Sequence, residues 1–324
     1  MLWLTWRQHR VEMISALVLL AALAIPLVIT GLALHAEYQS SGVAECVAGG
    51  GGGGCAALVD AFLERHTEWG NRFVWVSFLP ALAGVFIGAP LFAREFETGT
   101  WCLAVTQGVT RTRWLTAKIT LVGGGVVGVA GLCAVLFTWW RTPLDEIGGR
   151  MRTAAFVVAA PSLMAVTLFA FALGVLAGAL LRRTIPAMVA TLVTYVTVRI
   201  TTEESLRPHY RTPLSRTTDP TTNAGTEQLP ATDWTVNDGW VDSTGHHLTD
   251  AEKTDLLHTI YKGRSTPPDD LVDNYLATHG MRHYTEYHPD SSFWTFQTIE
   301  AALFLGTAVA LFVGAAWLVR RRIT

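Results

Sequence analysis

The sequence run that decides the fold class spans residues 154–181, AAFVVAAPSLMAVTLFAFALGVLAGALL, and holds no charged residue in 28 positions. Two further runs are also free of charge: residues 13–34, with 22 positions, and residues 301–319, with 19. About 20 apolar residues in a helix cross a hydrocarbon core about 30 Å thick. Charged residues make up 15% of the 324-residue chain, against about 25% in soluble domains. These figures exclude a soluble enzyme, a secreted disulfide scaffold and a disordered chain, and they indicate a polytopic membrane protein.

The apolar pattern around these runs predicts an all-α fold with six transmembrane helices. The predicted spans are residues 13–34, 73–92, 115–138, 154–181, 185–200 and 294–319. The segments then expected in the cytoplasm, together with Lys118, carry 11 of the 24 basic residues, against five in the two short outer loops. Because basic residues concentrate in cytoplasmic loops, both termini of this multi-pass protein are expected inside the cell (plasma) membrane. A cleaved signal peptide could mimic the first span, but its apolar run is longer than a signal peptide requires.

The chain divides by composition into three parts. Residues 1–200 are expected to hold an interfacial N-terminal helix and the first five spans, and residues 292–324 the sixth span and a basic cytoplasmic tail. Residues 201–291 between them carry 15 acidic residues, seven basic residues and seven of the ten histidines. A capping box from Thr249 to Glu252 predicts a helix start, and a second short helix is expected after Pro268. We therefore expect a small, mainly helical or irregular extracytoplasmic insertion, whose histidines lack conventional zinc spacing and predict no metal site.

Two cysteines on the predicted outer side flank a run of six glycines. Cys46 and Cys55 border residues 49–54, and the glycine run is typical of a flexible linker. Because the outer face is oxidising, a disulfide between the two cysteines is expected, with two free thiols as the alternative.

Glycines spaced four residues apart recur in three predicted spans. Such spacing lets two helix backbones approach closely, and the third span, with the densest glycines, is the strongest candidate for a tight contact. The alternative is that glycine is simply common in membrane helices. The candidate packing pairs are Gly84 and Gly88, Gly124 and Gly128, and Gly174 and Gly178.

One carboxylate falls at membrane depth. Glu300 lies about 10 Å into the sixth span at 1.5 Å per residue, and Arg199 ends the fifth span on the same predicted side. An intramembrane ion pair between them is expected, with a structural role favoured over a role in transport. In the alternative interpretation, the sixth helix starts late and Glu300 sits in the outer interface.

The most informative cytoplasmic stretch follows the second span. The order Arg94-Glu95-Phe96-Glu97-Thr98-Gly99-Thr100 predicts that the second helix continues through Glu97 and ends at Gly99. Thr100 can then cap a short helix that lies across the cytoplasmic face. An ordinary interfacial turn is the alternative. The candidate residues for contact with a soluble partner are Arg94, Glu95, Glu97, Gly99, Thr100, Trp101, Leu103, Gln107, Arg111 and Arg113.

Blocks of sequence spread from residue 3 to residue 300 carry a family resemblance, and their order is that of the family. The blocks are Trp3 to Arg10, Gly88-Ala89-Pro90, Arg94 to Thr100, Thr106-Gln107, Thr110 to Trp114, His288-Pro289, Phe293-Trp294, Phe296-Gln297 and Glu300. In these blocks the chain resembles ABC transporter permeases of the bacterial type-2, exporter-like class. The family's plan of six spans, with the longest outer loop between the fifth and sixth, matches the predicted map.

The resemblance implies a function and its partners. Residues 101–107 are similar to the coupling helix that docks on an ABC ATP-binding subunit, and the assembly implied has two permease chains, as a homodimer or with a related permease, and two ATPase chains. None of the three lysines follows glycine, as a Walker A motif requires, so this chain is expected to be no enzyme and to hold no cofactor. ATP and Mg²⁺ would bind the partner.

We therefore expect an exporter subunit that moves a hydrophobic drug, peptide or lipid outward through the lipid bilayer, with no nucleic-acid partner. The alternative function is a membrane sensor or assembly scaffold that binds a partner through residues 201–291.

Overall fold

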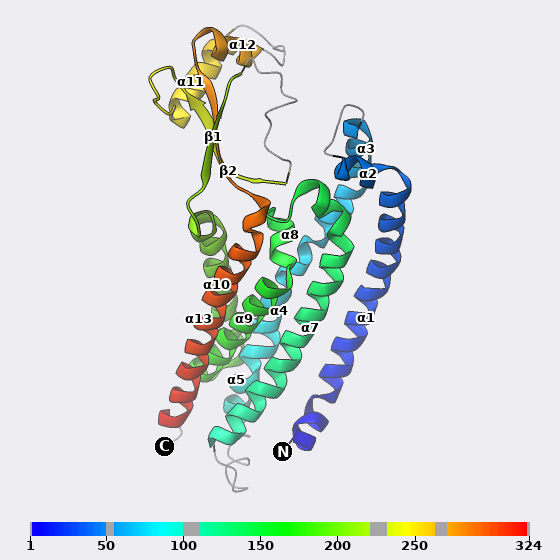
Figure 1. Cartoon of the computed structure of the whole chain (residues 1–324). Coiled ribbons are helices and arrows are strands. Elements are labelled where there is room, and N and C mark those ends of the chain that lie inside the picture. Colours follow the sequence, from blue (N-terminus) through cyan, green and yellow to red (C-terminus); the bar gives the residue numbers. More distant parts are fainter. Residues whose placement is uncertain (1, 50–54, 100–110, 221–231, 263–270, 323–324) are drawn as a thin grey trace. The chain divides into compact units, whose positions relative to one another are not determined.

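The computed structural model describes residues 2–49, 55–99, 111–220, 232–262 and 271–322 (Figure 1). The chain forms two compact units. Unit 1 consists of Met1–Arg207 and Phe293–Thr324, and unit 2 consists of Pro208–Ser292. The predicted insertion, residues 201–291, therefore begins a few residues too early, because its first residues continue the fifth span.

The described residues contain six helical segments that are long and apolar enough to cross a membrane, as predicted, and the chain is an integral membrane protein. They lie in α1 (Leu2–Ser40); η1 (Phe73–Phe78), α4 (Leu79–Leu82), η2 (Ala83–Gly88) and α5 (Ala89–Thr98); α7 (Arg111–Gly148); α9 (Ala160–Leu181); α10 (Thr184–Thr201), η3 (Thr202–Leu206) and η4 (Arg207–His209); and η5 (Asp290–Ser292) and α13 (Phe293–Arg322). We refer to them in this order as spans 1 to 6. The short helices α2 (Val43–Ala48) and α3 (Cys55–Arg72) connect spans 1 and 2.

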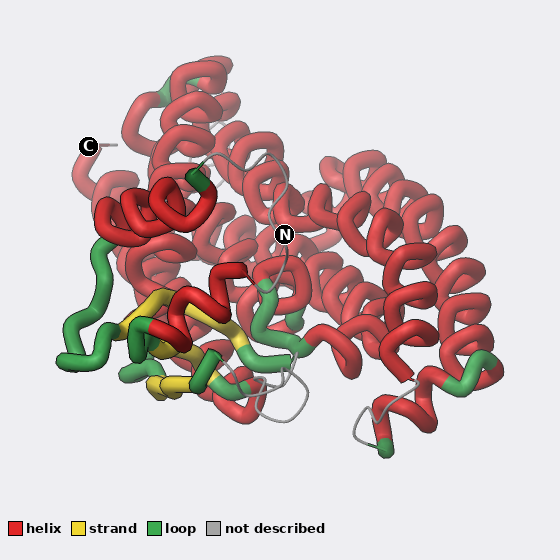
Figure 2. The backbone as a smooth tube through the Cα atoms, turned by 90° about the horizontal axis from the view of Figure 1, so that it is seen from above, coloured by secondary structure: helices red, strands yellow, loops and turns green. Residues whose placement is uncertain are grey.

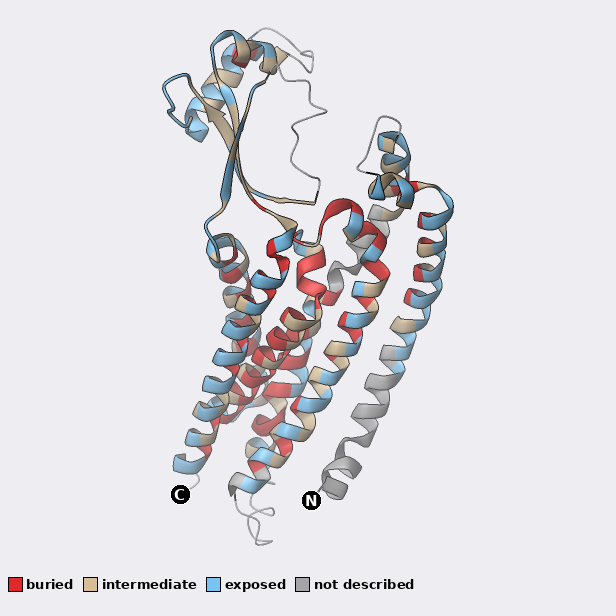
Figure 3. Ribbon diagram, in the orientation of Figure 1, coloured by how far each residue is buried: buried red, intermediate tan, exposed pale blue. Residues whose placement is uncertain are grey.

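Span 4 is the centre of unit 1. In its most apolar stretch 78% of residues are buried, against 61% in span 2 and 22% in each of the other spans. Figure 3 shows this as a concentration of buried residues on the inner helices, with exposed residues on the outward sides of α1, α7 and α13. The aromatic side chains of Phe169 and Phe171 in α9 pack against Phe304 and Phe312 of α13. Spans 2, 3, 5 and 6 are therefore arranged around span 4.

The predicted fourth span, residues 154–181, is wrong at its start. The structure divides this run into α8 (Thr153–Val158) and α9, and Ala159 between them has an extended backbone with ψ 139°. Pro161 explains the break, because its ring excludes the carbonyl of the residue four positions earlier and it has no N–H to donate. Pro161 therefore lies in the first turn of α9, where proline is tolerated.

Spans 3 and 5 are longer than predicted because charged residues extend them. The predicted third span ends at residue 138, whereas α7 runs to Gly148 and contains an ion pair between Arg141 and Asp145, four residues apart, at 2.9 Å. Pairs at this spacing stabilise a helix. The fifth span continues from α10 into a π-helical turn, η3, which contains Glu203.

Unit 2 is a small α/β unit, which corrects the prediction of a mainly helical or irregular insertion. Its strands β1 (Leu214–Thr218), β2 (Trp234–Val241) and β3 (Arg282–His288) form an antiparallel sheet in the order β1-β3-β2. Figure 2 shows these strands in yellow. The two predicted helices are present as α11 (Asp250–Tyr261), with the expected capping box at Thr249, and α12 (Leu271–Thr278). The central strand carries few apolar residues, so its sequence gave no strand signal.

Candidate functional site

The end of span 2 has the form predicted from its sequence. α5 continues through Glu97 to Thr98, and Gly99 follows with φ 73°. Glycine adopts this left-handed conformation without the steric cost that a Cβ would add. The helix therefore ends where the candidate coupling stretch begins. Part of that stretch, with Thr100, Trp101, Leu103 and Gln107, lies outside the described residues, as does the side chain of Arg111.

Both carboxylates near the end of α5 bind neighbouring spans. Glu95 forms an ion pair with Lys118 of α7, whose side chain is buried. Glu97 accepts two hydrogen bonds from the first residue of α10: one from the backbone N of Thr184 at 3.2 Å and one from its Oγ1 at 2.7 Å. The acidic residues of this motif therefore connect span 2 to spans 3 and 5, while Arg94 and Arg113 are exposed.

Phe96 contributes a third contact at this end of unit 1. The guanidinium of Arg182 lies 5.8 Å from the centre of the Phe96 ring, within the range of a cation–π interaction. Arg182 sits in the turn between α9 and α10 with φ 55°, the one non-glycine residue with positive φ among the described residues. The end of α5 thus contacts spans 3 and 5 and the connection between spans 4 and 5.

Four of the six predicted packing glycines lie at a backbone contact between spans 2 and 4. A Cβ added to Gly174 would lie 2.3 Å from the carbonyl oxygen of Gly84, and one added to Gly178 would lie 2.4 Å from that of Ala89. A Cβ on Gly84 or Gly88 would likewise meet the backbone of α9, at 2.5 and 2.6 Å. Since real Cβ atoms do not approach this closely, no side chain fits at these four positions.

Gly124 and Gly128 of the third span face no other helix of this chain, so the tight contact expected for them stays a prediction. A Cβ added at either position meets nothing within 4 Å in this chain. The neighbouring Gly123 and Gly131 face the side chains of Phe171 and Met164. The glycine spacing is the same in both spans, and it carries no information on which side of the helix a neighbour lies.

The opposite end of unit 1 contains a buried cluster of charges centred on Glu300. Its side chain is 0% exposed and accepts hydrogen bonds from Arg199 Nη1 at 2.8 Å, Arg207 Nε at 2.9 Å and Arg207 Nη2 at 3.1 Å. Glu203 adds a second carboxylate, 2.6 Å from Arg199. The structure therefore brings the predicted pair together and completes it with Arg207 and Glu203, so that two positive and two negative charges offset each other.

Polar and aromatic groups from α8, α9 and α13 surround this charge cluster. Ser162 Oγ donates to Glu300 at 2.9 Å, and the Ser162 backbone N donates to Gln297 Oε1 at 3.1 Å. Gln297 Nε2 in turn donates to the Phe156 carbonyl at 2.8 Å, and Arg207 lies 4.3 Å from the centre of the Phe156 ring. The cluster therefore connects spans 4, 5 and 6, and its groups satisfy the hydrogen-bonding requirement of a buried carboxylate.

Sequence reasoning missed Arg207, Glu203, Ser162 and Thr184. The first two fall just past the predicted end of span 5, in the charged stretch that the composition assigns to the insertion. A signal was present, since Arg199, Glu203 and Arg207 follow each other at intervals of four, the spacing of ion pairs along a helix. Ser162 and Thr184 have no comparable signal, because a single hydroxyl residue near a span end is common.

The glycine-flanking cysteines form a disulfide between α2 and α3. Cys46 and Cys55 are bonded, with their Cα atoms 5.6 Å apart. Cys133 in α7 is a buried free thiol. The disulfide closes the loop that contains the glycine run.

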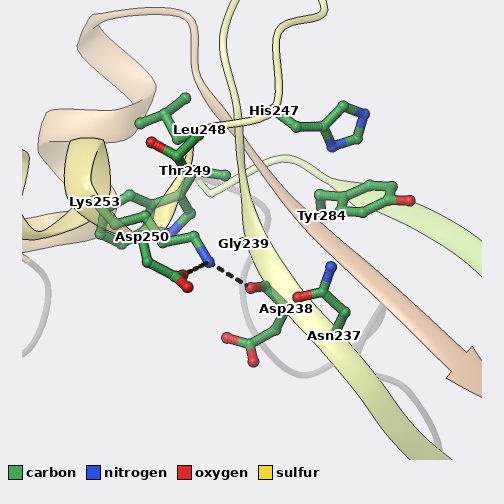
Figure 4. A pocket seen from close by; sticks show the side chains of 10 residues that line it. Asn237, Asp238, Gly239, His247, Leu248, Thr249, Asp250, Lys253 and Tyr284 are labelled. Carbon is green, nitrogen blue, oxygen red and sulfur yellow. Dashed lines mark hydrogen bonds and ion pairs between the residues drawn. The ribbon is translucent and has the colours of Figure 1, made fainter. Parts of the chain in front are cut away.

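Among the described residues of unit 2, a pocket of about 340 Å³ lies between β2, β3 and the start of α11 (Figure 4). Lys253 Nζ donates to the Asp238 carbonyl at 2.8 Å and lies 3.4 Å from Asp250. The Lys253 ammonium is therefore paired with groups that line the pocket. In the part of the chain that the structure describes, no three His, Cys, Asp or Glu side chains lie close enough to hold a metal ion.

Glu252 and His288 are among the groups of unit 2 whose pKa values are shifted. Hydrogen bonds from Thr249, first from its backbone N and then from its hydroxyl, lower the pKa of Glu252 in the capping box. Burial lowers the pKa of His288, whose Nε2 lies 3.0 Å from the Pro208 carbonyl oxygen. Since that oxygen can only accept, His288 donates from Nε2. Both groups stabilise unit 2 itself.

Comparison with known proteins agrees with this architecture. A family model described as ABC-2 membrane transporter related matches residues 17–207, which is more than half of the chain. The matched stretch covers spans 1 to 5 and ends at Arg207, the last residue of the first part of unit 1. No curated protein and no solved structure matches the chain.

Proposed function

Because the chain belongs to the ABC-2 membrane transporter related family, we propose that it is the membrane-spanning permease subunit of an ATP-driven exporter. A separate ABC ATP-binding subunit binds ATP and Mg²⁺ and supplies the energy. Two permease chains form the pathway in the plasma membrane, and both termini face the cytoplasm. The substrate class that suits the largely apolar spans is a hydrophobic drug, peptide or lipid.

One observation carries this proposal beyond family membership. At the end of α5, just before the segment that resembles a coupling helix, Glu95 and Glu97 bind two other spans directly. A force applied to this end by a soluble partner therefore reaches several spans at once. The arrangement suits a protein that performs no chemistry itself and changes conformation when its partner does.

The buried charge cluster has a structural role in this proposal. Glu300 is fully enclosed and binds two arginines and Ser162, which leaves little room for a transported ion or headgroup in this conformation. The cluster therefore fixes spans 4, 5 and 6 relative to each other at the end opposite the coupling stretch.

The test is purification of the tagged full-length chain from membranes of its native host. A protein with Walker A and ABC signature motifs should copurify, and the purified complex should hydrolyse ATP. The matched control is the chain with residues 100–108 replaced by a Gly-Ser linker of equal length, which should lose the partner while remaining in the membrane. Absence of any ATP-binding protein from the wild-type preparation would contradict the proposal.

The second candidate is a sensor or assembly scaffold that binds its partner through the insertion, and the compact fold of unit 2 favours it. Unit 2 is a separate α/β unit with its own sheet and pocket. Replacing residues 210–290 with a short linker separates the two functions. A scaffold would lose its partner, whereas a permease would still bind and stimulate its ATPase.

A further inference from the structure

The start of α10 is capped by another helix. Arg183, which precedes the helix, makes no side-chain capping hydrogen bond. Glu97 of α5 supplies the acceptor instead, since its Oε2 receives both the backbone N–H and the hydroxyl of Thr184. The first N–H groups of a helix lack partners within the helix, and the dipole favours a negative charge there. Glu97 therefore satisfies one of these N–H groups and joins the first residue of α10 to α5.

Close packing reinforces this contact over the next turn. Ala187 of α10 is fully buried in a cluster with Ala89 and Ala93 of α5. Alanine methyl groups bring the two helices close together, and the hydrogen-bonded cap then prevents one from sliding past the other. Displacement of the end of α5 therefore displaces the start of α10.

The other end of α10 enters the buried charge cluster. Arg199 lies 15 residues beyond Thr184, about 22 Å along the helix axis at 1.5 Å per residue. It binds Glu300 of α13 and Glu203 of η3. A continuous helix of this length moves as one element, so a shift at Thr184 reaches the contacts of Arg199.

We propose that Glu97 is a positioning residue that transmits movement of the end of α5 into α10 and from there to the Arg199–Glu300 contact. This rests on the proposed function, in which an ATP-binding subunit moves the end of α5. Glu95 contacts a different span, because it binds Lys118 of α7. Glu97 thus couples span 2 to the contact between spans 5 and 6, and Glu95 couples span 2 to span 3.

The test uses the full complex with its ATP-binding subunit in lipid nanodiscs. Spin labels at Thr201 of α10 and Thr298 of α13, two exposed positions near the charge cluster, report the distance between spans 5 and 6, with labelled chains diluted by unlabelled ones. Distance distributions are compared without nucleotide and with ATP plus vanadate. In the wild type we expect the nucleotide to shift the distribution.

Four variants separate transmission from simple damage. Removing the acceptor in Glu97→Ala, or the hydroxyl in Thr184→Val, should reduce the shifted population about threefold, the scale of one exposed hydrogen bond. Thr184→Ser keeps the hydroxyl, so its shifted population should equal that of the wild type. Glu95→Gln, the matched control on the same helix, should leave the shift between spans 5 and 6 in place. In every variant the ATP-binding subunit should still copurify.

The outcomes also distinguish this inference from the function on which it rests. A wild-type complex that hydrolyses ATP, with Glu97→Ala and Thr184→Val retaining the full shift, would overturn the role of Glu97 and leave the permease function standing. A wild-type complex without any shift would overturn the transmission to span 6. Failure of an ATP-binding subunit to copurify with the wild-type chain would overturn the function and the inference together.

Discussion

Arg207 binds Glu300 through two parallel hydrogen bonds: its Nε donates to Oε2 at 2.9 Å and its Nη2 donates to Oε1 at 3.1 Å. The planar guanidinium matches the carboxylate in this arrangement, which an ammonium group cannot reproduce. Arg207 ends the polar extension of span 5, and Glu300 lies in span 6. The pair therefore joins two spans at a fixed distance and a fixed orientation.

Removal of the charge of Glu300 should destabilise the protein. Glu300→Gln leaves Arg199 and Arg207 buried with one carboxylate fewer, and breaking a buried pair in this way costs about 3 kcal/mol. Thermal unfolding of the full-length chain in detergent measures the loss. Glu204→Gln is the matched control, because Glu204 is exposed and its loss should change stability by about 0.5 kcal/mol or less. If Glu300→Gln left assembly and ATP hydrolysis intact but abolished transport, the structural role assigned to Glu300 would be wrong.

Gly174 of span 4 and Gly124 of span 3 should differ sharply in their tolerance of alanine. A Cβ at Gly174 would lie 2.3 Å from a backbone oxygen, and such overpacking costs about 1–3 kcal/mol or more. Gly124→Ala meets open space and should be neutral or stabilising, by up to about 1 kcal/mol of helix propensity. Denaturant titration of both variants in micelles gives the comparison. Equal stabilities would show that spans 2 and 4 are not in backbone contact.

The Cys46–Cys55 disulfide should report which side of the membrane α2 and α3 occupy. If they lie outside, a membrane-impermeant reductant added to intact cells should make both cysteines reactive to a maleimide-polyethylene glycol reagent. Cys133 is buried and should remain unreactive. The double variant Cys46→Ser, Cys55→Ser opens the short loop that the disulfide closes between α2 and α3, which should cost about 2–3 kcal/mol of stability. Modification that requires permeabilised cells would reverse the predicted orientation.

The stability of unit 2 should decrease in mild acid because of His288. Burial lowers the pKa of His288 below the ordinary 6.5, so below about pH 6.5 the unfolded chain binds more protons at this residue than the folded chain does. Stability then falls as pH falls through that window and is unaffected by His288 above it. Thermal unfolding of the full chain between pH 8 and pH 5 should show the slope in the wild type.

His288→Gln keeps a donor for the Pro208 carbonyl and should flatten this pH dependence. The exposed His279 provides the control, since His279→Gln should leave the slope as it is in the wild type. A slope that persists in His288→Gln would assign the acid sensitivity to another group.

Features that depend on hydrocarbon thickness and on local backbone chemistry could be predicted from the sequence. The six spans follow from apolar length, the end of α5 from Gly99, and the start of α11 from the Thr249 capping box. Each of these depends on residues close together in the chain. Pro161 and the extension of span 5 show the limit of composition alone, because a continuous apolar run can contain a break and a charged stretch can remain helical.

Features that depend on which helix faces which could not be predicted in full. Gly124 and Gly174 have the same spacing in sequence, yet only Gly174 contacts another backbone. The contact between Glu97 and Thr184 joins residues 87 positions apart. The sequence around each residue does not indicate that the other is its partner. Within the charge cluster, the Arg199–Glu300 pair was predictable because both residues fall at membrane depth, where an unpaired charge is costly.

The π-helical turn η3 sets a constraint on chain length. A π turn winds more widely than an α turn, and here it keeps Arg199, Glu203 and Arg207 within reach of one another. Loss of one residue between Glu203 and Arg207 would rotate Arg207 by about 100° around the helix axis, away from Glu300 and toward the hydrocarbon. In aligned relatives that keep this cluster, we therefore expect substitutions in residues 204–206 but no gaps, whereas the glycine run between Cys46 and Cys55 should vary freely in length.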